Sequence, residues 1–348
     1  MRHRLFLLLL LPALLLPLSD TTARPRLLGH YKSIIHETDA SLYQVKLFKG
    51  GGVYASGADG YFISSGDNGK NWASTQIKQG VALKTMAWAT RKVAIVAGRE
   101  DGKNLVWRST DGAVTFDRTK VDTDLPIRDY AFFGRTHGFF VAGSAKKKDG
   151  TWRISKDGGR TFRKIDSVAY GNPARALLGI CRAGEKGLFA VGGHVHIGYV
   201  GEAAKSLLYR KKQGAVLKST DEGKSWVVLD AGNAADTLLY DVDFIDEKTG
   251  WVVGEKGFMA KTADGGKTWT KVTSGTKERL NAVQVIATET IYAVGENGTA
   301  IGTNDAGKTM IKFKTDTKYD LKDLSFLDMN TGFAVGTGGT VLRFVRDY

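Results

Sequence analysis

The sequence predicts an all-β protein, a seven-bladed β-propeller, from three observations. A short motif recurs six times, its copies follow at a period suited to one propeller blade, and each repeat carries the same alternation of apolar and polar residues broken by glycine. Glycine is abundant, at 43 of 348 residues, while proline numbers only 5. That composition indicates many tight turns in an ordered chain.

The recurrent motif reads Ser or Thr, any residue, Asp, any residue, Gly, any residue, Thr or Ser, and then an aromatic residue. The second copy has Ala113 in place of the glycine, and the sixth ends in Met310. Successive motif aspartates lie 44, 46, 64, 43 and 41 residues apart, and a period in the forties is typical of one four-stranded blade. These aspartates are Asp67, Asp111, Asp157, Asp221, Asp264 and Asp305.

The motif residues suit a structural role. An aspartate in a turn accepts hydrogen bonds from nearby backbone N–H groups, the glycine adopts a conformation that other residues resist, and the aromatic residue packs between neighbouring sheets. We therefore expect the six aspartates to hold the blades together rather than to serve catalysis or bind a metal.

The seventh blade has to be assembled from both ends of the chain. After the sixth motif, residues 321–326, 332–336 and 340–345 supply three strands, and the fourth is missing. Residues 30–36 have no blade of their own. We expect this segment to add the outer strand of the last blade and close the ring, which removes exposed sheet edges.

Residues 1–23 have the pattern of a secretory signal peptide, with Arg2 and Arg4 before an apolar run over 5–18 and small residues at 21–23. An uncleaved leader acting as a membrane anchor is the alternative. We expect one domain over residues 24–348, exported to the periplasm, the thylakoid lumen or the extracellular space. The lone Cys181 cannot form an internal disulfide, and on a predicted inner strand it is best explained as a small buried hydrophobe.

The longest interval between motif aspartates indicates an insertion at about 194–214 in the fourth blade, basic at its end. Long insertions in repeat proteins often carry binding, and a solvated hairpin is the alternative. The chain has a formal net charge of +14, which favours acidic partners. Export argues against nucleic acid, so anionic protein segments or lipid headgroups fit better.

The unit from Asp241 to Trp269, with its Val-Gly-Glu turn at 253–255 that recurs at 294–296, resembles the blade of the photosystem II stability and assembly factor family. These proteins are seven-bladed Asp-box propellers, and the resemblance extends over nearly the whole mature chain. It implies a non-enzymatic assembly factor, in the thylakoid lumen or periplasm, that binds a membrane-protein client through a basic face. The Asp box alone is shared with sialidases, sortilin-type receptors and several glycosidases.

The resemblance suggests an arginine-rich face, and the repeats offer candidates for it. Lys84, Arg128 and Lys322 occupy one position in their blades, next to the innermost strand, and Tyr43 and Tyr240 fill it in two others. Arg175 and Arg279 lie one or two positions earlier. Such a ring around one channel mouth would hold an acidic or carboxylate-terminated peptide, whereas solvated surface cations are the alternative.

Three further motifs suggest other chemistry. Residues 302–309 match the consensus motif of a phosphate-binding loop. The motif coincides with the sixth Asp box between strands, however, where no helix would face a phosphate. His194 and His196 lie two apart, as a metal pair on a strand would, but no third ligand is evident. Asn297 begins an acceptor string for N-glycosylation that also reads as a turn.

We expect a monomer without cofactor or metal that binds a protein client, an acidic or C-terminal segment of a membrane protein, and contacts no nucleic acid. Peripheral contact with an anionic membrane surface is an open alternative. A sialidase-like glycoside hydrolase is the main enzymatic rival, although the Arg-Ile-Pro start motif of sialidases is missing. A secreted lectin-like or receptor-like module is the third hypothesis.

Overall fold

The computed structural model describes residues 29–34, 39–144, 149–164, 176–199, 207–229 and 237–347, with the side chains of 144, 149–152, 194–199 and 207–213 left out. The predicted signal peptide and Arg175 lie outside the described residues. Within these ranges, no helix has the length and apolar content that a membrane span requires.

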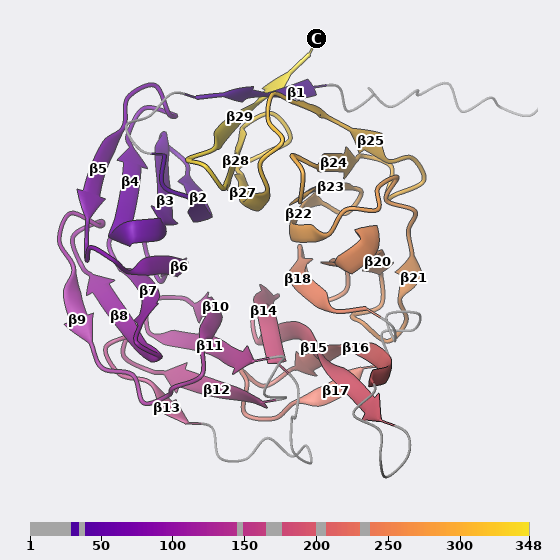
Figure 1. Ribbon diagram of the computed structural model, residues 1–348, viewed down its shortest axis with the longest axis horizontal. Coiled ribbons are helices and arrows are strands. Elements are labelled where there is room, and N and C mark those ends of the chain that lie inside the picture. Colours follow the sequence, from indigo (N-terminus) through magenta and orange to yellow (C-terminus); the bar gives the residue numbers. More distant parts are fainter. Residues whose placement is uncertain are drawn as a thin grey trace, which may run out of the picture.

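Seven sheets, antiparallel except for one parallel pair in the seventh, stand in a ring around a central axis, each with its blade's first strand innermost, as Figure 1 shows. The predicted fold class, a seven-bladed propeller, is confirmed. Blade one comprises β2 (Leu42–Phe48), β3 (Gly52–Gly57), β4 (Tyr61–Ser65) and β5 (Ala73–Gln76). Blade two comprises β6 (Ala82–Trp88), β7 (Ala94–Glu100), β8 (Lys103–Ser109) and β9 (Asp117–Thr119). Blade three comprises β10 (Ile127–Phe133), β11 (His137–Ser144), β12 (Asp149–Ser155) and β13 (Arg163–Lys164).

The later blades repeat this order, and two short 3-10 helices, η1 (Ala58–Gly60) and η3 (Glu255–Gly257), lie in the turns after second strands. Blade four comprises β14 (Ala176–Ala183), β15 (Gly187–Tyr199), β16 (Leu207–Ser219) and β17 (Val227–Leu229). Blade five comprises β18 (Leu239–Phe244), β19 (Gly250–Gly254), β20 (Met259–Thr262) and β21 (Thr270–Lys271). Blade six comprises β22 (Leu280–Ala287), β23 (Thr290–Gly295), β24 (Ala300–Thr303) and β25 (Ile311–Lys312). The seventh blade contains β27 (Leu321–Phe326), β28 (Gly332–Gly336), β29 (Val341–Arg346), β1 (Gly29–Ser33) and β26 (Lys314–Thr315).

Burial explains the composition of the strands. The second strands β19, β23 and β28 are buried along their whole length, because other blades pack on both of their faces, and they read as nearly continuous apolar runs. The residues of the outermost strands β5 and β21 are all exposed and, except for Ala73, polar. The core is therefore divided among the joints between blades, where rings stack in pairs such as Phe189 with Phe244, whose centroids lie 3.8 Å apart.

The ring is joined at the seventh blade by both ends of the chain. Strand β1 pairs antiparallel with β29, so that Tyr31 faces Phe344, and β26 adds a parallel fifth strand outside β1. Tyr31 is 1% exposed, and its ring packs edge-on against Phe313 and Phe344. The parallel strand β26 is a pairing that the sequence did not predict.

Each Asp box closes on itself at the end of the third strand, as the fifth blade illustrates. The Thr262 hydroxyl donates to Asp264 at 2.8 Å and accepts the Gly266 N–H at 2.9 Å. The hydroxyl and the backbone N–H of Thr268 donate hydrogen bonds of 2.6 and 2.9 Å to the Asp264 carboxylate. These bonds lower the pKa of Asp264 to about 2. Equivalent bonds surround Asp67, Asp111, Asp157, Asp221 and Asp305.

The Asp boxes also join neighbouring blades. Gly223, with a φ of +76°, presses against Phe139 of the previous blade so closely that an added Cβ would lie 2.4 Å from the ring. Lys218 directly precedes the fourth Asp box, and its Nζ donates a 2.8 Å hydrogen bond to the Gly265 carbonyl in the Asp box of the next blade. Arg108 makes the same bond to the Gly158 carbonyl at 2.8 Å.

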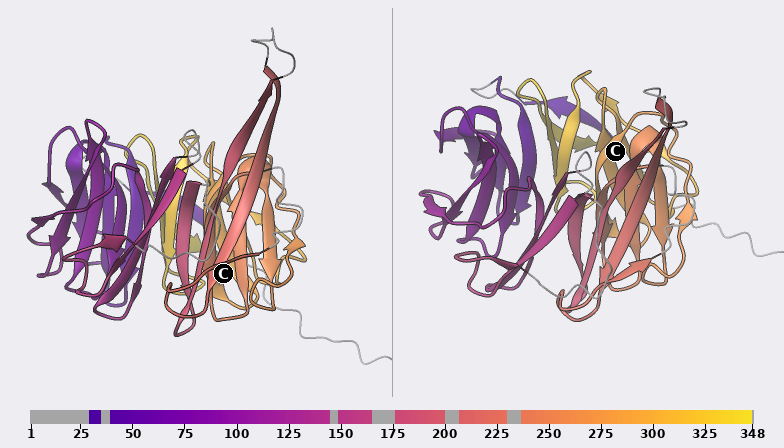
Figure 2. Two further views of the ribbon diagram at one scale, coloured as in Figure 1. Left: turned by 90° about the horizontal axis from the view of Figure 1, so that it is seen from below. Right: turned by 60° about the horizontal axis from the view of Figure 1, so that its bottom comes forward.

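Strands β15 and β16 form a long two-stranded ribbon that projects from one face of the propeller, as Figure 2 shows. The inner strand β14 begins at Ala176, opposite Gly193 of β15, and the pairing of β15 with β16 continues to Tyr199. The ribbon therefore extends beyond the face where inner strands begin. The Asp boxes follow the third strands, which run parallel to the first, so they lie at the opposite face.

Candidate binding site at the channel mouth

All seven innermost strands share one irregularity. Their register with the second strand shifts by one residue directly after a buried leucine or isoleucine, and this shift forms a β-bulge. A bulge re-aims the side chain of the extra residue, and bulges are common at rims and binding sites. The bulge residues are Tyr43, Lys84, Arg128, Leu178, Tyr240, Asn281 and Lys322.

These bulges bring the predicted site residues to one cavity of about 470 Å³ at the channel mouth. The cavity lies on the face from which the ribbon projects, because the bulges stand at the beginning of the inner strands. Arg279, which precedes its blade's bulge, joins the cavity, and its Nε–H donates to Asn281 at 2.9 Å. The predicted residues that line the cavity are Tyr43, Lys84, Arg128, Tyr240, Arg279 and Lys322.

Four of these residues, Lys84, Arg128, Arg279 and Lys322, are here called the rim cations. Arg279 lies 4.8 Å from the centroid of the Tyr240 ring and 2.7 Å from a Glu296 carboxylate oxygen. Lys322 pairs with Asp320 at 2.9 Å.

The other two rim cations, Lys84 and Arg128, have no acidic partner in the described part of the chain. Lys84 lies 5.8 Å from the centroid of the Tyr43 ring, and Arg128 donates through Nε to the Gly143 carbonyl at 3.0 Å. Among the described residues, no carboxylate lies within ion-pair distance of either cation. Lys84 and Arg128 are therefore the rim cations best able to receive an anion.

One residue deeper along their strands, three aspartates form a layer beneath the rim, here called the floor aspartates: Asp129, Asp241 and Asp323. Each accepts one backbone N–H from its own strand and one from the inner strand of the next blade. Asp129 accepts from Tyr130 at 2.8 Å and from Ile180 at 2.9 Å. The floor aspartates thus link blades around the channel.

Burial controls the ionisation of the floor. It raises the pKa of Asp129 to about 7 and that of Asp323 to about 6, against the backbone hydrogen bonds that favour the carboxylate. Burial and then repulsion from Asp129 raise the pKa of Asp241 well above its ordinary value. This layer was not predicted from the sequence, although a Leu-x-Asp or Ile-x-Asp string at the start of three inner strands marks it.

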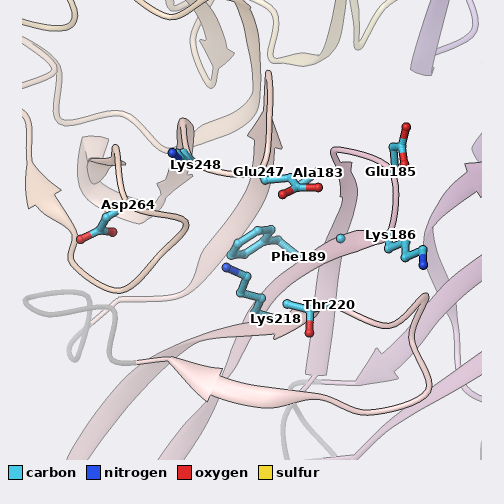
Figure 3. Close-up of a pocket in the computed structure, with 10 residues that line it drawn as sticks. Ala183, Glu185, Lys186, Phe189, Lys218, Thr220, Glu247, Lys248 and Asp264 are labelled. Carbon is cyan, nitrogen blue, oxygen red and sulfur yellow. The ribbon is translucent and has the colours of Figure 1, made fainter.

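A second cavity, of about 360 Å³, lies between blades four and five on the Asp-box side. Figure 3 shows Lys218 beside Phe189 at its centre, and the Lys218 Nζ lies 5.2 Å from the ring centroid. Because Lys218 also binds the Gly265 carbonyl, it is already used in the joint between blades. The flanking charges have both signs, through Glu247 and Lys248, so no single ligand charge is favoured.

The other motifs have structural surroundings. The phosphate-loop string spans β24 and the sixth Asp box, with Ala306 in a left-handed turn. The Asn297 amide donates to Glu278 at 2.7 Å within a left-handed turn. Burial raises the pKa of the Cys181 thiol, which suits an unreactive side chain. The side chains of His194 and His196 are not described, and no metal-binding cluster occurs among those that are.

Two sequence comparisons match part of the chain to one family of proteins. The sequence profile of a family described as "Photosynthesis system II assembly factor YCF48" matches residues 218–287. The chloroplastic photosystem II stability/assembly factor HCF136 of Guillardia theta is 43% identical over 51 residues, which are 14% of this chain and only 12% of that relative's length. The profile match runs from the end of β16 in the fourth blade through the fifth blade to β22 of the sixth.

Two solved structures share the fold over most of the chain. YCF48 bound to D1 peptide superposes with a TM-score of 0.68 at 14% identity, covering 91% of this chain and 97% of that chain. A GH74 enzyme from Niastella koreensis gives a TM-score of 0.64 at 13% identity, covering 89% of this chain and 53% of the enzyme. Identities this low establish the fold alone.

The protein is a seven-bladed Asp-box propeller with a polar, charged channel mouth. Its predicted resemblance to the photosystem II stability and assembly factor family is confirmed.

Proposed function

We propose that the protein is a non-enzymatic binding propeller, resembling photosystem II assembly and stability factors, that holds an acidic or carboxylate-bearing segment of a client protein at the channel mouth. The observation that carries the proposal is the convergence of four cations and two tyrosines on one cavity. Lys84 and Arg128 supply positive charge that no carboxylate of the described residues pairs with, and the tyrosine rings supply flat apolar contact.

The proposed client is an acidic or C-terminal segment of a membrane protein, bound by a monomer after export to the periplasm, thylakoid lumen or extracellular space. Support comes from YCF48, whose structure was solved with D1 peptide bound. The pattern of residues 1–23 supports export. The net charge of +14 suits an acidic client and also peripheral contact with an anionic membrane surface.

We place the β15–β16 ribbon in the same interface. It projects from the mouth face, so a segment bound at the rim passes near it. The basic run Arg210-Lys211-Lys212 lies on β16 within the ribbon, and its positive charge would extend the attraction for an acidic client. An isolated two-stranded ribbon is only marginally stable in water, so contact with a client would stabilise it.

Peptide binding tests the proposal. A rhodamine-labelled, aspartate-rich peptide with a free carboxyl terminus should bind, and its twin with asparagines and an amidated end should bind much more weakly in fluorescence anisotropy. The double variant K84E/R128E should lower the affinity for the acidic peptide by about tenfold or more, because two attractive contacts become repulsive. The matched control K271E/K312E makes the same charge change on exposed outer strands and should leave the affinity nearly unchanged. Equal losses in both variants would reduce the effect to net charge and contradict the proposed site.

A glycoside hydrolase is the alternative that one observation favours. The floor aspartates have raised pKa values in a cavity, as a general acid would, and a GH74 enzyme shares the fold. Both oxygens of Asp129 and Asp323, however, already accept backbone N–H groups. A panel of fluorogenic sugars decides between the two functions: turnover that Asp129→Asn abolishes would establish the hydrolase and overturn the binding function.

A further inference from the structure

The cavity at the channel mouth contains two layers of opposite charge. The rim cations surround the opening, and the floor aspartates lie one residue deeper along the inner strands. Two rim cations are already matched by carboxylates, since Arg279 pairs with Glu296 and Lys322 pairs with Asp320. The electrostatic potential at the rim, which an incoming anion experiences, therefore depends on whether the floor aspartates are ionised.

Charged groups face the floor from every side of the channel. Asp243 lies two residues beyond Asp241 on β18, and repulsion from its carboxylate raises the pKa of Asp241. Attraction to Lys46 on β2 lowers the pKa of Asp323. The other titratable groups around the floor are Tyr43, Lys84, Arg128, Tyr130, Cys181, Tyr240, Arg279, Asp320 and Lys322.

We propose that the floor aspartates regulate anion binding at the rim. When ionised they oppose the rim cations, and when protonated they leave the positive charge of the rim unopposed. This regulation rests on the proposed function, because it requires an anionic segment at the mouth. It follows that an acidic segment binds more tightly in mild acid and that its binding draws protons onto the floor.

The floor aspartates change their protonation in a pH range in which the carboxylates of a bound peptide stay ionised. The pKa of Asp323 is about 6 and that of Asp129 about 7, whereas exposed peptide carboxylates lose their protons near pH 4. Removing one buried negative charge roughly 10 Å from a bound anion changes its affinity by about tenfold at an effective dielectric constant near 20. The expected effect is therefore about tenfold tighter binding between about pH 8 and about pH 5.5.

Isothermal titration calorimetry with the aspartate-rich peptide tests the regulation. The affinity should rise about tenfold over that pH range, and titrations near pH 7 in two buffers of different ionisation enthalpy should show proton uptake on binding. In D129N/D323N, two floor charges are removed, so the affinity at pH 8 should approach the wild-type value at pH 5.5 and the pH dependence should flatten. If that variant does not fold, proton uptake by the wild-type protein still decides, because an uptake of zero would overturn the regulation.

Two controls separate the sources of a pH effect. Histidine titrates in the same range, and His194 and His196 lie on the ribbon, so H194Q/H196Q should keep the wild-type pH dependence. Loss of the dependence in that variant would assign it to the ribbon and overturn the floor as regulator. Binding that needs Lys84 and Arg128 yet does not vary with pH would refute only the regulation, whereas binding that ignores both cations would refute the proposed function itself.

Discussion

The backbone N–H of Val45 donates a 2.9 Å hydrogen bond to the carboxylate of Asp323, and 278 residues separate the two along the chain. The bond joins the innermost strand of the last blade to that of the first. The same carboxylate accepts the Leu324 N–H at 2.8 Å. One floor aspartate therefore links the two ends of the propeller and lines the binding cavity.

Replacement of Asp323 by alanine should lower the free energy of unfolding by about 2–3 kcal/mol, because two buried N–H groups lose their acceptor. Asp323→Asn, which keeps one acceptor oxygen, should cost less. Urea denaturation measures both, and Asp316→Ala, at an exposed position, is the control that should stay within about 0.5 kcal/mol of wild type. Equal stabilities of the Asp323 and Asp316 variants would show that the link between blades contributes little.

Tyr31 should stabilise the seventh blade through its ring and not through its hydroxyl. Its side chain is 1% exposed, and its hydroxyl has no hydrogen-bond partner among the described residues. Tyr31→Ala should therefore cost about 3–5 kcal/mol, and Tyr31→Phe should be neutral or stabilising. Thermal unfolding followed by circular dichroism measures both. A large loss in the phenylalanine variant would reveal a hydrogen bond and contradict this expectation.

Much of this architecture was predictable because a propeller repeats its local chemistry. Each Asp box binds its own turn, so six copies mark six blades. The rim residues were candidates because most of them occupy one position in their repeats, which the structure shows to be a bulge. The floor was missed because its bonds join residues far apart, such as Asp241 and Val283, and an aspartate in an alternating strand reads as an ordinary solvent-facing residue. The pairing of β26 with β1 has no local signal at all.

The close joint at Gly223 should tolerate no side chain. Gly223→Ala adds a Cβ 2.4 Å from the Phe139 ring at a positive φ, so it should destabilise the protein by about 2–4 kcal/mol. Gly80 has a similar φ of +79° with no atom within 4 Å of an added Cβ. Gly80→Ala should therefore show only the backbone cost of about 1–2 kcal/mol. Chemical denaturation compares them, and equal losses would mean that the contact with Phe139 relaxes freely.

Stability should be greatest near pH 5, because two sets of aspartates have opposite effects. The floor aspartates bind protons more tightly in the folded state, so their contribution is complete below their unfolded pKa of about 4 and is lost as the pH rises through about 6 to 7. Asp264 has a pKa lowered to about 2, so its contribution is complete above about pH 4 and is lost as the pH falls toward 2. Thermal midpoints measured from pH 3 to pH 8 test this, with D129N/D323N flattening the alkaline side. A wild-type midpoint that rises steadily from pH 5 to pH 8 would contradict it.

The most direct test of the binding site follows the arginine side chains by NMR during titration with the aspartate-rich peptide. The Nε–H groups of Arg128 and Arg279 are both hydrogen-bonded at the mouth, and that of Arg108 is hydrogen-bonded to Gly158 on the opposite face. We predict that the Arg128 and Arg279 signals shift with saturation and that the Arg108 signal stays in place. A saturable shift of Arg108 with the other two unmoved would place the ligand on the Asp-box face and contradict the account.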